Sequence, residues 1–432
     1  MPLANDALKA PAAPLWKSWQ HRPLAVGLLL LAGLAALLAR DDRRMAVLLL
    51  LGAALGITLY HAAFGFTGAY RRLITERDTR GVQAQLVMLG AATLLFAPVL
   101  AAGSVFGREV AGAIAPVGWQ VAAGAFLFGI GMQLGNGCGS GTLFTLGGGS
   151  TRMLATLAAF VAGSFWASLD MGWWQALPSW PPIALGAVFG WPLGVALQIA
   201  FLLVLWLGLK RWGKPVLKNT ANAGAAGGRR IILSGPWPLP AGGLALAGLN
   251  FMTLLIAGHP WSITWAFTLW GAKIAMLLGW NPESSAFWQG DFQQAALQGG
   301  VLDDITSVMD IGLLVGALCA AALAGRFAPR LHIPLRSLVA AILGGLLMGY
   351  GARIAFGCNV GAFFSGVAST SLHGWLWIAA ALPGTWIGIK LRPWFRLPNQ
   401  GQPAGRHAPC SCKKSHRDPT KVESSQPSED RP

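Results

Sequence analysis

Two cysteines in apolar sequence have the clearest chemical potential in this chain. Cys138 and Cys358 each follow a glycine and are followed three residues later by another, at Gly137, Gly141, Gly357 and Gly361. A thiol is a weak hydrogen-bond donor with a polarizable sulfur, so it suits a soft ligand such as a sulfane sulfur better than sulfate or phosphate. A single buried cysteine is usually only a packing residue. Its duplication favours a functional role for both.

The glycines around these cysteines predict broken helices. Each glycine disfavours a helix interior by ~1 kcal/mol relative to alanine. Broken backbone at membrane depth is tolerated only where it is buried in protein or lines a cavity. A helix that restarts there presents free N–H groups to an anion, and glycine lets the anion approach closely. We therefore predict an anion passage lined by the motif glycines, both cysteines and Gln133, Asn136 and Asn359.

Two cations in apolar sequence are further candidates for the passage. Arg353 precedes Cys358 by five residues, within a stretch where an unpaired charge costs ~2.5–3.5 kcal/mol to insert into a membrane. It should face the protein interior, near the anion or an acidic partner. Lys273, in Leu-Trp-Gly-Ala-Lys-Ile, is a weaker candidate because its long side chain could extend to the membrane interface.

The elements that position these residues are transmembrane helices. Of the 432 residues 54% are hydrophobic and only 11% are charged, against ~25% in an average soluble domain. The net charge of +16 comes from basic segments between apolar stretches, which indicates cytoplasmic retention rather than nucleic-acid binding. We predict spans near residues 24–39, 45–61, 82–102, 121–135, 153–169, 183–209, 239–257, 311–324, 338–354 and 375–391.

The basic loops predict a multi-pass protein of the bacterial inner membrane with both termini in the cytoplasm. The domain boundaries follow from composition. Residues 1–44 hold an N-terminal segment and an extra span, and 45–209 a first membrane repeat. Residues 210–236 form a basic, Gly/Ala-rich cytosolic linker, 237–391 a second repeat and 392–432 a disordered cytosolic tail.

The two halves carry an internal repeat. A shift of 220 residues, the separation of Cys138 and Cys358, also superposes four glycines and pairs Trp166 with Trp386. On the predicted topology the spans that enter the two cysteines run in opposite directions, so we expect inverted repeats, an arrangement typical of transporters. Segments 61–70 and 259–273 are predicted as interrupted or re-entrant helices. The fold class is thus an all-α polytopic bundle with about nine to ten spans.

No resident cofactor, metal site or catalytic residue is predicted. The tail cysteines Cys410 and Cys412 form a Cys-x-Cys pair, which lacks the two-residue spacing of a convincing zinc site. Cys319 has no partner in the repeat and is expected to be a packing residue.

Three longer motifs contain these candidate residues. They are Gly-Ile-Gly-Met-Gln133-Leu-Gly-Asn-Gly-Cys138-Gly-Ser-Gly, Gly-Ala-Arg353-Ile-Ala-Phe-Gly-Cys358-Asn-Val-Gly and Trp261-Ser-Ile-Thr-Trp-Ala-Phe-Thr-Leu-Trp-Gly-Ala-Lys273. Over residues 45–391 the chain resembles the YeeE/YedE family of sulfur transporters. The resemblance implies inverted repeats around a central passage and uptake of thiosulfate through contacts with the motif cysteines. It also implies a soluble TusA-like sulfur-carrier protein as a potential cytosolic partner. Many relatives have a further cysteine where this sequence has Gly65.

Several alternatives remain open from the sequence. The cargo could be a selenium compound or another small sulfur species. A membrane sulfurtransferase or thiol oxidoreductase could use the same cysteines, although it would need an activated thiolate. A purely structural membrane factor would explain the Trp-rich and Gly-rich helices equally well.

Overall fold

The structure is a computed structural model that describes residues 19–214, 232–329 and 332–399. It is almost entirely helical. The first half contains α1 (His21–Asp41), α2 (Arg43–Ala62), α3 (Phe66–Glu76), α4 (Arg80–Ala102), α5 (Trp119–Gly135), α6 (Gly139–Gly147), α7 (Arg152–Leu169), α8 (Met171–Gln175), α9 (Leu185–Phe189) and α10 (Trp191–Trp212). The second half contains α12 (Leu239–Ala257), α13 (Thr264–Leu277), α14 (Asp291–Gln298), α15 (Ile305–Leu323), α16 (Leu335–Ile354), α17 (Ser365–Ala368) and α18 (Leu372–Leu391).

Short elements complete the described chain. The 3₁₀ turns are η3 (Pro282–Ser284), η4 (Ala286–Gln289), η5 (Val301–Asp303) and η7 (Arg392–Phe395), and η6 (Asn359–Phe364) is a π-helix. Strand β1 (Ser104–Val105) pairs with β2 (Arg108–Glu109), and β3 (Val117–Gly118) pairs with β4 (Ser179–Trp180), both antiparallel. Most of the predicted tail, including Cys410 and Cys412, and most of the predicted linker lie outside the described residues, whereas the first tail residues form η7.

Within the described ranges, nine helical segments are long and apolar enough to cross a membrane, which confirms the all-α polytopic class. Two predicted boundaries differ from the structure. The span expected at residue 183 begins at Trp191, because Gly190, at φ 79°, separates it from α9. The span expected at residue 311 begins at Ile305, because the Asp304 carboxylate accepts a hydrogen bond from the Ser307 N–H and caps the helix.

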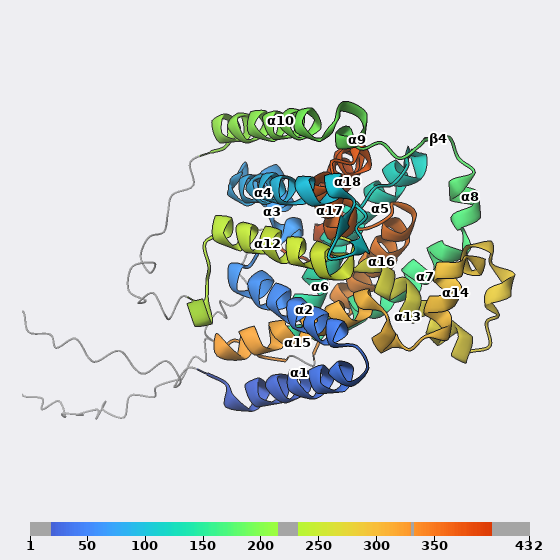
Figure 1. Cartoon of the computed structure of the whole chain (residues 1–432). Helices are drawn as coiled ribbons and strands as arrows, with labels where there is room; N and C mark the ends of the chain where they lie inside the picture. The colour runs from blue at the N-terminus through green and yellow to red at the C-terminus, as the bar shows by residue number, and fades with distance from the viewer. Residues whose placement is uncertain (1–18, 215–231, 330–331, 400–432) are drawn as a thin grey trace, which may run out of the picture. The chain divides into compact units, whose positions relative to one another are not determined.

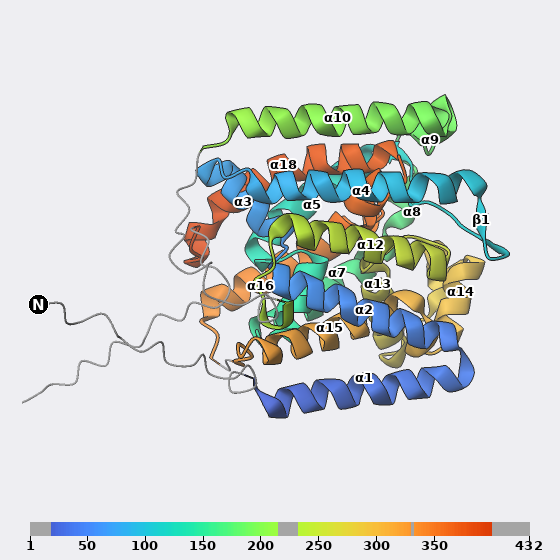
Figure 2. The ribbon, with the colours of Figure 1, turned by 60° about the vertical axis from the view of Figure 1, so that its left-hand side comes forward.

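The long helices lie side by side, and Figures 1 and 2 show their ends gathered in two groups. The end that we call the basic end holds the α3–α4 junction and the last residues of α10 and α18, with Arg72, Arg77, Lys210, Arg211 and Arg392. The other end, called the acidic end, holds the segment from Leu278 to Asp304. Arg44 lies at this acidic end because its guanidinium donates hydrogen bonds to the Ile256 and Ala257 carbonyls at the end of α12.

The two halves of the sequence pack through one another. Helix α16 contacts α5 and α7, α15 contacts α2, and α18 contacts α5. Backbones approach closely at these crossings: a β-carbon on Gly52 would lie 2.2 Å from the Met309 carbonyl oxygen, and one on Gly349 would lie 2.2 Å from that of Phe160. Such small-residue crossings are typical of membrane helix bundles. The helices of both halves therefore surround a single buried interior.

Candidate functional site

The motif cysteines lie at the breaks between helices that the glycines predicted. Helix α5 ends at Gly135, Asn136 takes a left-handed conformation (φ 66°), and Cys138 is the N-cap of α6. In the second half α16 ends at Ile354, Phe356 is left-handed (φ 58°), and Cys358 is the N-cap of the π-helix η6. The two halves thus share one local architecture. The inverted orientation of the two repeats stays a prediction.

The two motifs meet inside the protein. Cys138 is 1% exposed and Cys358 is fully buried. A β-carbon on Gly139, next to Cys138, would lie only 3.4 Å from the Cys358 sulfur. The amides of Ser140 and Gly141 lie within reach of the Cys138 sulfur, and those of Val360 and Gly361 within reach of the Cys358 sulfur. Thiols and helix-start N–H groups therefore converge on one place.

The motif glycines are required by their surroundings. Gly357 has φ 146°, and its β-carbon would lie 2.7 Å from the Ala362 nitrogen. A β-carbon on Gly137 would lie 3.1 Å from the Gly141 carbonyl carbon, so this turn is also tight. At Gly361 an added β-carbon would lie 3.3 Å from the hydroxyl of Ser262, a residue that lines the cavity described below.

Several buried polar atoms near the cysteines have no hydrogen-bond partner within the described residues. Neither amide atom of Asn359 makes a hydrogen bond of normal geometry, although the residue is fully buried, and neither do the hydroxyls of Tyr70 and Thr142. The Tyr70 hydroxyl lies near Cys138 and within reach of the Asn359 side chain, so these two groups can bond to each other. Since buried polar groups in proteins are nearly always satisfied, this cluster has unused capacity for a polar occupant.

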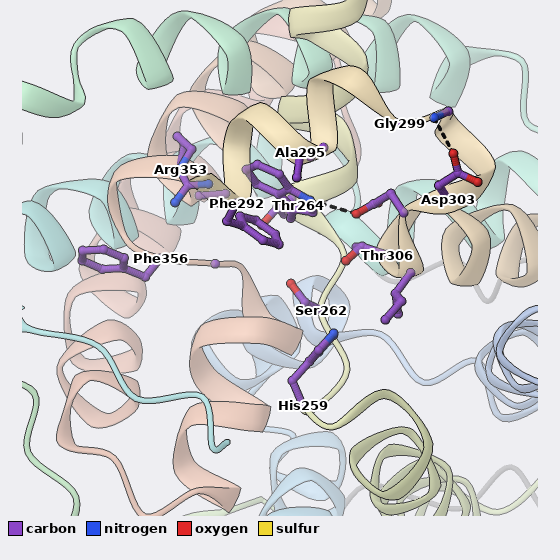
Figure 3. Close-up of a pocket in the computed structure, with 17 residues that line it drawn as sticks. His259, Ser262, Thr264, Phe292, Ala295, Gly299, Asp303, Thr306, Arg353 and Phe356 are labelled. Carbon is purple, nitrogen blue, oxygen red and sulfur yellow. Dashed lines mark hydrogen bonds between the residues drawn. The ribbon is translucent and has the colours of Figure 1, made fainter. Parts of the chain in front are cut away.

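A cavity of about 540 Å³ opens at the acidic end and reaches down to the second motif. Its wall includes Ser262 and Thr264 before and within α13, Gly299 and Asp303 near α14, and Phe356 and Gly357 beside Cys358. Figure 3 shows Arg353 and Phe356 on one side of this cavity and Asp303 and Thr306 on the other. The cavity therefore leads from the acidic end to Gly357, the residue before Cys358.

Arg353 lines this cavity as a cation without a carboxylate partner among the described residues. Its guanidinium carbon stacks 4.9 Å from the centre of the Phe287 ring, and its buried Nε has no hydrogen-bond partner. The acids of the same cavity are already engaged, since Asp304 accepts from the Trp265 indole and Asp303 from the Gly300 N–H. Arg353 is thus a cation of this cavity that has no ionic partner among the described residues.

Lys273 does not line the cavity in the described structure. Its ammonium donates hydrogen bonds of 2.9 Å and 2.6 Å to the carbonyls of Leu297 and Gly299. These contacts hold the segment from α14 to Gly300 against α13. Its direct role in the passage stays a prediction, whereas its observed contacts support the cavity wall.

Gln133 and Asn136 lie at the opposite, basic end of the site. The Gln133 amide donates to the Thr67 carbonyl and accepts from Arg71, and the Asn136 side chain accepts from both Arg71 and Arg392. Arg152 adds hydrogen bonds to the Leu134 and Gly135 carbonyls. Burial, and then the charges of Arg71 and Arg152, lower the pKa of Arg392.

The positive charges of Arg71, Arg152 and Arg392 stabilise the C-terminal end of α5, where free carbonyls carry a partial negative charge. None of the three was singled out from the sequence, since each reads as an ordinary loop cation. Asp310 was also missed, because the span was expected to begin one residue later. A carboxyl within an apolar helix is the signal that would have found it.

At Gly65 the structure leaves room for a side chain. Gly65 is the N-cap of α3, and a β-carbon there would meet no atom within 4 Å. Its neighbours Phe64 and Phe66 are each only 2% exposed.

A polytopic bundle with broken helices around buried thiols is the architecture of a membrane transporter, and the sequence comparisons agree. The family model described as "Sulphur transport" matches residues 61–387, so the chain belongs to that family. This confirms the family resemblance seen in the motifs.

Individual relatives are also named as transporters. The chain is 35% identical to "Probable transporter YedE" of Escherichia coli over 178 residues, 41% of this chain and 43% of that protein. It therefore aligns with less than half of YedE. It is 27% identical to "Thiosulfate transporter TsuA" of Spirochaeta thermophila over 361 residues, 78% of this chain and 96% of that protein. Against the Escherichia coli TsuA the identity is 24% over 359 residues, 80% of this chain and 94% of that protein.

Proposed function

We propose that this protein carries a small sulfur-containing anion into the cell, with thiosulfate as the first candidate. The observation that carries the proposal is the meeting of Cys138 and Cys358 among buried polar groups that the described residues leave incompletely satisfied. Two polarizable sulfurs suit the outer sulfur of thiosulfate, and the adjoining N–H groups suit its oxygens. The thiosulfate transporters among the relatives support this choice of cargo.

The proposed route begins in the cavity at the acidic end. Arg353 attracts the anion, which then passes Gly357 and Gly361 to reach Cys358 and Asn359. Cys138 receives it beside Gly137 and Gly141, and the anion leaves past Gln133 and Asn136 toward the arginines of the basic end. Each step exchanges one set of donors for another, so the anion is never without hydrogen bonds inside the membrane.

The orientation of the protein is also proposed. Because basic segments are retained on the cytoplasmic side, the basic end faces the cytoplasm and the acidic end the periplasm of a bacterial inner membrane. Both termini are then cytoplasmic. A TusA-like sulfur carrier could collect the cargo at the basic end.

Cysteine variants test the proposal. We expect Cys138→Ser and Cys358→Ser each to reduce uptake of radiolabelled thiosulfate about tenfold or more, the effect of losing one interaction of ~1.4 kcal/mol in the passage. The cells should lack their other sulfate and thiosulfate importers. Cys319→Ser is the matched control, since this buried thiol packs against Gly27 on α1, outside both motifs.

Unchanged uptake in both motif variants would refute the proposed route. Two further measurements separate the alternatives. Competition by selenium compounds that exceeds competition by thiosulfate would favour a selenium cargo. A labelled persulfide that stays on Cys138 or Cys358 after denaturation would favour a membrane sulfurtransferase, in place of the non-enzymatic passage proposed here.

A further inference from the structure

Asp310 is a buried carboxyl that the proposed route does not use. It lies on α15, is fully buried, and neither of its oxygens has a hydrogen-bond partner within the described residues. It follows Asp304 and Thr306, which line the cavity, by six and four residues. At 1.5 Å per residue Asp310 therefore lies about 9 Å further along the helix axis than Asp304.

Among the described residues, the elements packed against α15 offer Asp310 no counter-ion, and the turn η5 adds only the carboxyl of Asp303. Helix α1 carries ionisable side chains only near its two ends, and α2 only in its first two and last three residues. Helix α6 has none beyond its N-cap Cys138. On α13, the Lys273 ammonium is already bonded to two carbonyls. The ionisable groups whose charge reaches Asp310 are Asp304, at the cavity, and Cys358.

An isolated carboxylate in such a place is unfavourable by several kcal/mol, so a buried acid without a partner keeps its proton. The neutral acid carries no charge, so it does not repel an anion near Cys358. The ionised form would repel that anion. Protonation of Asp310 and occupation of the passage by an anion therefore favour each other. Ionisable residues inside a membrane are also commonly part of a transport path.

We propose that Asp310 binds a proton that is transported together with the anion, a step that rests on the proposed function. The proton enters from water in the cavity and binds a carboxylate oxygen of Asp310. The anion then passes the cysteines, and the O–H bond breaks as the proton passes from the same oxygen to water on the basic side. No other bond forms or breaks, and the pH gradient across the membrane supplies the driving force for accumulation.

The test uses purified full-length protein in liposomes with the membrane potential held at zero. With one proton per anion and an outside pH one unit lower, wild-type protein should accumulate radiolabelled thiosulfate up to about tenfold, the factor that one pH unit represents. Asp310→Asn mimics the neutral acid but cannot release a proton. It should keep thiosulfate counterflow within about twofold of wild type and lose accumulation entirely.

The control variant is Asp170→Asn. Asp170 follows α7 and accepts a hydrogen bond from Tyr350, away from the cysteines, so its loss should leave pH-driven accumulation intact. A second measurement on wild-type protein does not depend on the folding of any variant. Addition of thiosulfate outside should acidify the lumen of liposomes loaded with a pH indicator.

Accumulation by Asp310→Asn, or loss of counterflow in a folded Asp310→Asn protein, would overturn the proposal. So would a wild-type protein that performs counterflow yet neither responds to the pH gradient nor acidifies the lumen. If wild-type protein shows no thiosulfate counterflow at all, the proposed function itself fails, a result distinct from those above.

Discussion

Replacement of Arg353 gives the sharpest prediction from the site. Its guanidinium is the cavity cation without a carboxylate partner in the described structure, and its Nε is unpartnered. A hydrogen bond to a charged group contributes about 1.5–3 kcal/mol. Because the cavity is open to water, we expect the lower part of this range. Arg353→Gln should thus raise the KM for thiosulfate uptake about tenfold to thirtyfold, with a smaller effect on the maximal rate.

The matched variants separate charge from packing. Arg353→Lys keeps the charge but loses the planar fork, so its KM should lie between those of wild type and Arg353→Gln. Phe287→Leu removes the ring on which the guanidinium stacks, a contact that contributes about 0.5–1 kcal/mol. It should raise KM less than about fivefold.

The assay is initial-rate uptake of radiolabelled thiosulfate at several salt concentrations. Because salt screens charge attraction, the wild-type KM should rise with added potassium chloride, and the KM of Arg353→Gln should rise less. If Arg353→Gln keeps both the wild-type KM and its salt dependence, Arg353 does not attract the anion and the reasoning fails.

Two further predictions concern stability, measured by thermal unfolding in detergent. Gly357→Ala should destabilise the protein by about 1–3 kcal/mol, because Gly357 has φ 146° and its β-carbon would press on Ala362. The control Gly65→Ala, whose β-carbon meets no atom within 4 Å, should change the free energy of unfolding by no more than about 0.5 kcal/mol. Equal effects of the two substitutions would contradict the role assigned to the Gly357 turn. A hydrogen bond from Arg80 holds the pKa of Asp78 below its usual value, so Asp78 stabilises the fold above pH ~4 and loses this contribution as the pH falls through its lower folded pKa. Asp78→Asn should therefore be less stable than wild type at pH 7 and converge with it in acid, and a constant difference at all pH values would contradict this assignment.

The sequence predicted much of the fold because each prediction rested on local physics. Glycine runs break helices wherever they occur, so the breaks before Cys138 and Cys358 were visible in the chain. Long apolar stretches have few alternatives to spanning a membrane. The boundary of α15 was wrong because a carboxyl at Asp310 lowers local hydropathy, although the helix continues through it from Ile305.

What the sequence determined by itself was the class of protein: membrane helices, two related Gly-Cys motifs and a cation ahead of the second. Only the tertiary structure decided which of these residues meet. It placed Gly139 beside Cys358 and made the segment before Asp304 a wall of the cavity. It also placed the Lys273 ammonium where it donates a hydrogen bond to the Leu297 carbonyl and not to the cavity. It also left Asp310 without a hydrogen-bond partner in the part of the chain that the structure describes. Helix breaks follow from a few adjacent residues, whereas contacts and unpaired charges depend on how distant helices pack.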